Sequence, residues 1–248
     1  MKIVVIGEIG VDIFIYCNSN RLSPEAPVPI LNPFKTIINA GMAGNTGENL
    51  DVLSPNSTIQ YLSQDENITK TRYVDQKSNH MFFRVDEGEG NIKSFKWGEK
   101  TTNLIFKSDI VVVSDYDKGF LTNSDLISIG INSSLSILDS KRKLTQDIVD
   151  AFTFVKLNES ESLNNPGLDD SNIITTLGVR GAKYKGKIYP PQNPQKTIDV
   201  SGAGDTFTAA FIVKYKQTHN IEDSIEYANR KSSEVVSKPG VVTPTNHL

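Results

Sequence analysis

The sequence predicts a three-layer α/β/α sandwich with a central, mostly parallel sheet and a small antiparallel β lid. Short apolar runs that end in a polar residue or a glycine recur at 2–7, 109–115, 135–140, 152–158 and 172–178. Such runs are typical of strands that are buried on both faces of a parallel sheet. Stretches of helical length separate most of them, and alternating strands and helices define this fold class.

Ligands of such folds bind at the carboxyl ends of the strands. Polar residues or glycine stand at these positions in four of the runs: Asp115, Asp139, Asn158 and Gly178. We therefore expect the functional site at this edge of the sheet.

The chain has 248 residues, and we expect one domain over 1–248. A net charge of −3 gives no broad basic surface, so neither nucleic acid nor a membrane is an expected partner. Cys17 is the only cysteine, which excludes an intrachain disulfide and fits a reducing compartment. No apolar run approaches the ~20 residues of a membrane span. We expect a cytoplasmic protein.

Two segments, about 12–38 and about 70–96, lack a helical period and are rich in β-branched residues, prolines or turn residues. We predict that they form short antiparallel strands that pair into a lid inserted in the domain. A small sheet needs cover for its apolar face, which a ligand or a second subunit would supply.

The stretch DVSGAGDTF at 199–207 combines a glycine-rich turn with the start of a helix. The first amides of a helix lack intrahelical partners, and glycines let an anion approach them closely. Asp205 follows at once. A carboxylate beside an anion site suits phosphoryl transfer, because it can deprotonate the attacking hydroxyl while the amides neutralise the transferred group. Alternatively, Asp205 only begins the helix and the glycines only form a turn.

Two further motifs follow predicted strands. Asn158 and Glu161 could hold Mg²⁺, through water as magnesium prefers, or could form a helix capping box. The turn TLGVRGA, with Thr176, Gly178 and Gly181, suits backbone contact with a nucleotide. It also reads as a hairpin turn, because an alternating strand pattern follows it.

Together these motifs resemble those of the ribokinase/PfkB family of carbohydrate kinases. DVSGAGDTFTAAF resembles the family's C-terminal signature, NESE its N-x-x-E motif, and TLGVRGA its T-x-G-x-x-G turn. GEIGVD followed by AGMAGN resembles its N-terminal sugar-binding elements. The five elements stand in the family's order and span nearly the whole chain.

The runs RLSPEAPVPIL, VVSDYDKGFL and ILDSKRK resemble one branch, the heptose 7-phosphate kinase domain of bifunctional ADP-heptose synthesis proteins. The resemblance implies a ribokinase-like fold and transfer of the γ-phosphoryl of ATP to a sugar hydroxyl. It implies a heptose 7-phosphate, phosphorylated at O1, as the acceptor.

The resemblance also implies roles for single residues. Asp205 resembles the catalytic base, and the amides of Gly202, Ala203 and Gly204 resemble the anion hole. Asn158 and Glu161 match the residues that hold Mg²⁺ and the nucleotide phosphates. The remaining matches are the nucleotide turn at Thr176, Gly178 and Gly181, the adenine pocket at Asn229, the sugar contacts Asp12, Gly41 and Asn45, and a possible K⁺ site near Asp199. Lids of this family often pair between subunits, which implies a homodimer.

A sugar that carries a phosphate needs cationic partners. Arg84 and Lys118 are candidates on chemical grounds, and Arg72 is a weaker one. Each of them could equally be a solvated surface charge.

The chain departs from the family pattern at three places. Met42 replaces the second of two adjacent glycines before the sugar-binding asparagine, and Glu8 replaces an aspartate. The region 50–72 is also shorter than in family members. We expect this shortening to remove a helix or two from one side of the sheet and to expose a face that a second subunit covers.

Two other functions have partial support in the sequence. Because the departures lie in the sugar half, the chain could be a sugar-phosphate or nucleotide-binding protein that has lost turnover. VVIGEIGVD suggests a nucleotide-dependent oxidoreductase, but the required G-x-G-x-x-G is missing, since only Gly7 and Gly10 are present. The sequence also lacks a Walker A motif, which excludes a P-loop kinase.

Overall fold

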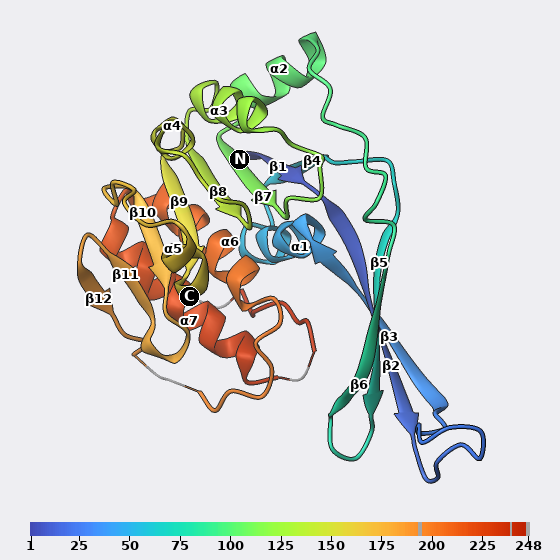
Figure 1. The fold of residues 1–248 in the computed structure, drawn as a ribbon. Helices are drawn as coiled ribbons and strands as arrows, with labels where there is room; N and C mark the ends of the chain where they lie inside the picture. The colour runs from blue at the N-terminus through green and yellow to red at the C-terminus, as the bar shows by residue number, and fades with distance from the viewer. Residues whose placement is uncertain (193–194, 239, 247–248) are drawn as a thin grey trace.

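The computed structural model describes residues 1–192, 195–238 and 240–246, and within them the strands form an eight-stranded and a four-stranded sheet (Figure 1). Helices pack on both faces of the larger sheet, which confirms the predicted three-layer α/β sandwich. No helix in these ranges is both long and apolar enough to cross a membrane.

The larger sheet is parallel in its centre. Its strands, in spatial order, are β12 (Lys187–Tyr189), β11 (Ala182–Tyr184), β10 (Ile173–Thr176), β9 (Phe154–Asn158), β8 (Ser136–Ser140), β7 (Ile110–Asp115), β1 (Lys2–Gly7) and β4 (Thr58–Leu62). Within the described residues, its antiparallel pairs are β10 with β11 and β11 with β12. All five apolar runs predicted as strands are strands of this sheet, and together with β4 they run parallel and place their carboxyl ends along one edge.

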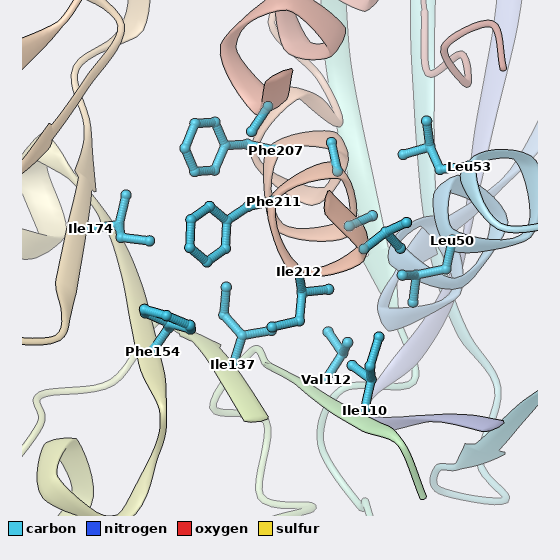
Figure 2. Close-up of a cluster of buried hydrophobic side chains, with 14 of the residues drawn as sticks. Leu50, Leu53, Ile110, Val112, Ile137, Phe154, Ile174, Phe207, Phe211 and Ile212 are labelled. Atoms are coloured by element: carbon cyan, nitrogen blue, oxygen red, sulfur yellow. The ribbon is translucent and has the colours of Figure 1, made fainter. Parts of the chain in front are cut away.

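Alternate residues of these strands enter two separate hydrophobic cores. One core lies under α1 (Ala43–Leu53), α6 (Ala203–Thr218) and α7 (Ile221–Val236). Phe207, Phe211 and Ile212 of α6 lie over Ile137, Phe154 and Ile174 there (Figure 2). The other core lies under α2 (Glu99–Phe106), α3 (Asn123–Ile131) and α4 (Gln146–Ala151), while α5 (Glu159–Asn164) follows β9 directly. Burial on both faces explains the continuous apolar character of the strands.

The smaller sheet is formed by strands that overlap the two segments predicted as a lid, and it extends away from the main body (Figure 1), whereas 88–96 contains no strand. Its order is β3 (Asn32–Met42), β2 (Ile9–Asn18), β5 (Ile68–Asp75) and β6 (Met81–Glu87). The sheet is mixed rather than purely antiparallel, because β2 and β5 are parallel. Each of these two strands continues from a strand of the main sheet, β1 or β4, and those two are themselves parallel. Each then returns through its own antiparallel partner.

The shortened region does not leave an apolar sheet face uncovered. After α1 the chain enters the edge strand β4, where Gln60 is exposed and Leu62 is partly buried on the side of the second core. Phe95 lies in the extended segment before α2 and joins Val4 and Ile6 of β1 in that core. The expectation that a trimmed face requires a second subunit is therefore wrong, because a polar edge and the segment around Phe95 take the place of the cover.

Phe211→Ala should lower the free energy of unfolding by about 3–5 kcal/mol, because its fully buried ring lies at the centre of the first core. Denaturant unfolding measures this loss. Phe106→Ala makes the same change in a ring that is 69% exposed, so it should stay within about 0.5 kcal/mol of the wild type. Equal losses in the two variants would contradict the assignment of the core.

Candidate active site

A cleft of about 800 Å³ opens at the carboxyl ends of the central strands, next to the start of α6. Several residues predicted to act on phosphate face it from β9, the turn after β10 and α6. They are Asn158, Thr176, Gly178, Gly202, Gly204 and Asp205. The structure thus brings together, on three separate elements, residues that lie far apart in the sequence.

The glycines at the start of α6 lie against close neighbours. Gly202 has a positive φ of 78°, and a Cβ there would lie 2.8 Å from the Asn45 amide nitrogen. A Cβ at Gly204 would lie 2.9 Å from Nζ of Lys156. The N–H of Ala203 donates to the Val200 carbonyl at 3.3 Å. Within the residues that the structure describes, the N–H groups of Gly202 and Gly204 donate to no acceptor, so two of the three predicted anion-hole amides are open.

Asp205 faces the cleft but is held firmly from the side of α1. Asn45 Nδ2 donates to Oδ2 at 2.6 Å, and Thr46 Oγ1 donates to Oδ1 at 3.2 Å. The Tyr116 hydroxyl reaches Oδ1 at 3.4 Å. Only 8% of Asp205 is exposed; this burial, with the negative charge of Asp139, raises its pKa from 3.8 to about 6, against the opposing bond from Asn45. Asp205 therefore stays ionised at neutral pH and is a stronger base than an ordinary aspartate.

Two lysines and an aspartate form the floor of the cleft. Lys156 on β9 is 2% exposed, and its ammonium lies 2.9 Å from Oδ2 of Asp139. Lys141 lies 3.6 Å from the other oxygen of Asp139. Burial alone would raise the pKa of Asp139, but the charges of Lys156 and Lys141 hold it below its ordinary value. We did not predict this cluster, although a lysine inside the apolar run FTFVKLN was a signal for it.

Asn158 and Glu161 form the capping box that was the alternative interpretation of their motif. The Glu161 N–H donates to Asn158 Oδ1 at 2.8 Å, and the Asn158 N–H donates to Glu161 Oε2 at 2.7 Å. Lys141 occupies the remaining carboxylate oxygen at 2.6 Å. These oxygens fit a Mg²⁺ ion held through water rather than by direct coordination. No group of three or more His, Cys, Asp or Glu side chains suits a metal in the described ranges.

A second cavity, of about 230 Å³, adjoins the cleft on the side of α7. It is lined by the residues predicted to contact a nucleotide, Thr176, Gly178, Gly181 and Asn229. Asn229 is buried and donates to the Tyr189 carbonyl at 2.7 Å. The turn between β10 and β11 connects two antiparallel strands, which confirms the hairpin interpretation of TLGVRGA, and the nucleotide contact stays a prediction. The two cavities share Thr176, Gly178, Val200 and Gly204, and one elongated ligand could occupy both.

The predicted sugar contacts lie at the base of the lid. Asp12 on β2 is hydrogen-bonded by Arg72 on β5, and a Cβ at Gly41 would lie 2.7 Å from Asp12 Oδ2. Asn45 instead contacts Asp205. Among the cation candidates, Arg84 pairs with Asp86 at 2.7 Å and is largely exposed. The weaker candidate, Arg72, is therefore the one that lies beside a predicted sugar contact.

Lys118 and Asp199 are both paired in this structure. Lys118 pairs with Glu89 at 2.6 Å. The Asp199 carboxylate accepts the N–H groups of Ser201 and Gly240, at 2.9 and 3.0 Å, and so ties together two loops near the start of α6.

Met42 and Glu8, which depart from the family pattern, have distinct structural roles. Met42 precedes α1 with φ 59° and ψ −134°, a backbone conformation that strains any residue except glycine, and its side chain is buried against Gly10. Glu8 is fully buried and accepts the N–H groups of Tyr116 and Lys118, both at 2.9 Å. Glu8 therefore fixes the loop that follows β7.

The profile of the pfkB family of carbohydrate kinases matches residues 56–248. The chain belongs to this family. The match covers most of the chain and includes the cleft, the glycine turn and Asp205. Family membership confirms the predicted class of carbohydrate kinases.

Curated relatives include the bifunctional protein HldE of a Nitratiruptor species, 26% identical over 292 residues that cover 98% of this chain and 63% of the relative. HldE of Sulfurimonas denitrificans is 28% identical, with 98% and 62% covered. The chain thus spans about three fifths of these relatives. The aligned stretch is longer than the 248 residues of this chain, so the relatives have insertions relative to it.

Solved structures confirm the ribokinase-like fold. Arabidopsis thaliana ribokinase complexed with ribose and ATP superposes with a TM-score of 0.70 at 14% identity, covering 98% of this chain and 96% of that one. Thermotoga maritima ribokinase gives 0.73 at 15%, with 96% and 94% covered. Escherichia coli phosphofructokinase-2 in complex with potassium gives 0.70 at 13%, with 98% and 95% covered.

The raised pKa of Asp205 predicts a dependence of stability on pH. Because its pKa in the folded state, about 6, exceeds the ordinary 3.8, the folded protein loses stability as the pH rises between these values. Asp205→Asn removes this loss. The difference in melting temperature, variant minus wild type, should therefore be more positive at pH 8 than at pH 4.5.

Asp150→Asn, at an exposed position of α4, provides the control, and its relative melting temperature should not change between the two pH values. A relative melting temperature of Asp205→Asn that stays constant, or falls, as the pH rises would contradict the raised pKa.

Proposed function

We propose that this protein transfers the γ-phosphoryl of ATP to a hydroxyl of a sugar phosphate, with O1 of a heptose 7-phosphate as the acceptor atom. The observation that carries the proposal is the buried carboxylate of Asp205 beside the open amides of Gly202 and Gly204, in a cleft of about 800 Å³. An anion cradle and a base in contact are what phosphoryl transfer to an alcohol requires.

In this proposal the base and ribose of ATP occupy the smaller cavity by Asn229, and the phosphates extend toward Gly204. Lys141 and Lys156 are cations that line the cleft there. Mg²⁺ would supply further neutralisation of phosphate charge, held through water near Asn158 and Glu161. The loops joined by Asp199 would hold K⁺, the ion with which the structurally similar phosphofructokinase-2 is in complex. Because ATP is made and consumed there, we propose a cytoplasmic location.

Asp205 takes the proton of the acceptor hydroxyl while the oxygen of that hydroxyl bonds to the γ-phosphorus. The bond from the γ-phosphorus to the β,γ-bridging oxygen breaks at the same time. Asn45 and Thr46 hold the carboxylate in one orientation. The open amides of Gly202 and Gly204 neutralise the charge of the transferred group without reorganising, because α6 fixes them. The heptose 7-phosphate acceptor is supported by the HldE relatives, over the part of their length that this chain spans.

Asp205→Asn should lower the rate of phosphoryl transfer by about 10²–10⁴-fold, the usual effect of removing a general base, and should leave ATP affinity nearly unchanged. Release of ADP in the presence of ATP and D-glycero-β-D-manno-heptose 7-phosphate measures the rate, with Asp150→Asn as the matched control. Wild-type protein that binds ATP but transfers phosphoryl to no sugar phosphate would instead favour the binding-protein alternative.

We also propose that the protein is a homodimer that forms through the lid. The strand register places Ile38 and Val85 in one row with Ile13, and Phe83 points to the same face. Ile38 is 65% exposed and Phe83 is 48% exposed. An apolar sheet face of this kind needs cover, whereas the opposite face carries the predicted sugar contact Asp12.

Ile38→Glu should convert the dimer into a monomer, which sedimentation velocity detects as a twofold fall in mass. Ile131→Glu makes the same change at the exposed end of α3 and should leave the mass unaltered. A wild-type protein that sediments as a monomer would contradict the proposal directly.

A further inference from the structure

Two lysines and one glutamate from three separate elements meet at the base of the lid. Lys70 lies near the start of β5, Lys118 lies in the loop after β7, and Glu89 follows the end of β6. The ammonium of Lys118 is 2.6 Å from Oε2 of Glu89, and that of Lys70 is 3.3 Å from Oε1. The carboxylate therefore bridges a cation of the lid and a cation of the main body.

The side chain of Tyr116 lies between this cluster and the proposed base, Asp205. Nζ of Lys70 is 5.6 Å from the ring centroid of Tyr116, whose hydroxyl is 3.4 Å from Asp205 Oδ1. Lys70 is also the register neighbour of Asp12, the predicted sugar contact on β2. A sugar lying along Tyr116 would present one end to Asp205 and the other end to the lysines.

The backbone of Lys118 is held in place by Glu8, whereas no strand or helix holds the backbone of Glu89. Glu8 accepts the N–H of Lys118 and those of its neighbours in the loop, Tyr116 and Phe120. Glu89 lies outside helix and strand, directly after Gly88. The carboxylate can thus leave the lysines without breaking a hydrogen bond of either sheet.

The charges of the cluster do not balance. One carboxylate faces two ammonium groups, so one positive charge is left over. Glu89 Oε1 is buried and accepts no hydrogen bond within the described part of the chain. Burial alone would raise the pKa of Glu89, but the hydrogen bond from Lys118 and the charge of Lys70 hold it below the ordinary value, so the group is an anion at neutral pH. A phosphate dianion has the charge and the oxygens that two lysines require.

We propose that Lys70 and Lys118 form the subsite for the phosphate group of the acceptor sugar, and that Glu89 occupies this subsite until the acceptor binds. The inference rests on the proposed function and adds to it the place of the acceptor's own phosphate. It does not use Arg84, whose guanidinium pairs with Asp86 two residues along the same strand. Binding of the acceptor phosphate and release of the Glu89 carboxylate are then one event.

Calorimetric titration with D-glycero-β-D-manno-heptose 7-phosphate and with the unphosphorylated heptose tests the subsite. Lys70→Met and Lys118→Met should each weaken binding of the heptose 7-phosphate roughly 10- to 100-fold, as expected for a lost charge-assisted hydrogen bond, and should leave the heptose nearly unaffected. Glu89→Gln should act in the opposite direction and tighten binding of the phosphate roughly threefold to tenfold, because an internal competitor is removed.

Matched controls separate the subsite from general charge effects. Glu87→Gln removes the same charge two residues earlier, at the end of β6, where Glu87 accepts a hydrogen bond from Thr69. Lys93→Met removes a lysine that is 70% exposed and pairs with Glu66. Neither variant should alter the affinity for either sugar. The opposite signs expected for Glu89→Gln and the lysine variants also exclude loss of folding as the cause.

The proposal is overturned if wild-type protein binds the heptose 7-phosphate no more tightly than the heptose, or if Glu89→Gln weakens that binding. If Glu89→Gln gained as much affinity for gluconate, a sugar acid, as for the heptose 7-phosphate, the choice of phosphate as the ligand would be overturned. These outcomes are distinct from failure of the proposed reaction, because binding is measured without ATP. A protein that discriminates phosphate through the lysines but transfers no phosphoryl would retain the subsite and lose the kinase assignment.

Discussion

The contact between α1 and the first turn of α6 determines the rest of the site. Asn45 and Thr46 donate to the two oxygens of Asp205, and they join parts of the chain about 160 residues apart. The contact holds a carboxylate next to open backbone amides, where an anion would bind. A buried carboxylate with such donors stays ionised near neutral pH although burial raises its pKa. The first core keeps α1 and α6 in place relative to the sheet.

Charge balance around this contact organises the cleft. Asp139 separates Lys156 from Lys141, and Lys141 reaches across to Glu161 in α5, just after β9. Each of these two cations is thus paired with a carboxylate of the chain. The lysines at the base of the lid are paired in the same way. Phosphate groups of the substrates would therefore compete with carboxylates of the chain itself, which limits how tightly other anions bind.

Much of this could be predicted from the sequence. The five apolar runs became central strands because buried parallel strands have no polar face. SGAGD marked the start of α6 because Gly202 has a positive φ, which glycine adopts most readily, and both glycines lie against close neighbours. The parallel pairing of β2 and β5 could not be predicted, since alternation fixes the face of a residue but not the direction of its neighbour. The pairs of Arg72 with Asp12 and of Lys118 with Glu89 depend on tertiary distances that spacing does not encode.

The pH dependence of kcat/KM for phosphoryl transfer, measured for the wild type and for the residual activity of Asp205→Asn, tests the central claim most directly. If Asp205 must be ionised in the free enzyme to accept the proton, kcat/KM of the wild type should fall below about pH 6. The variant should lack this fall, apart from any titration of the substrate phosphate that both proteins share. The same inflection at the same amplitude in both proteins would show that Asp205 does not accept the proton.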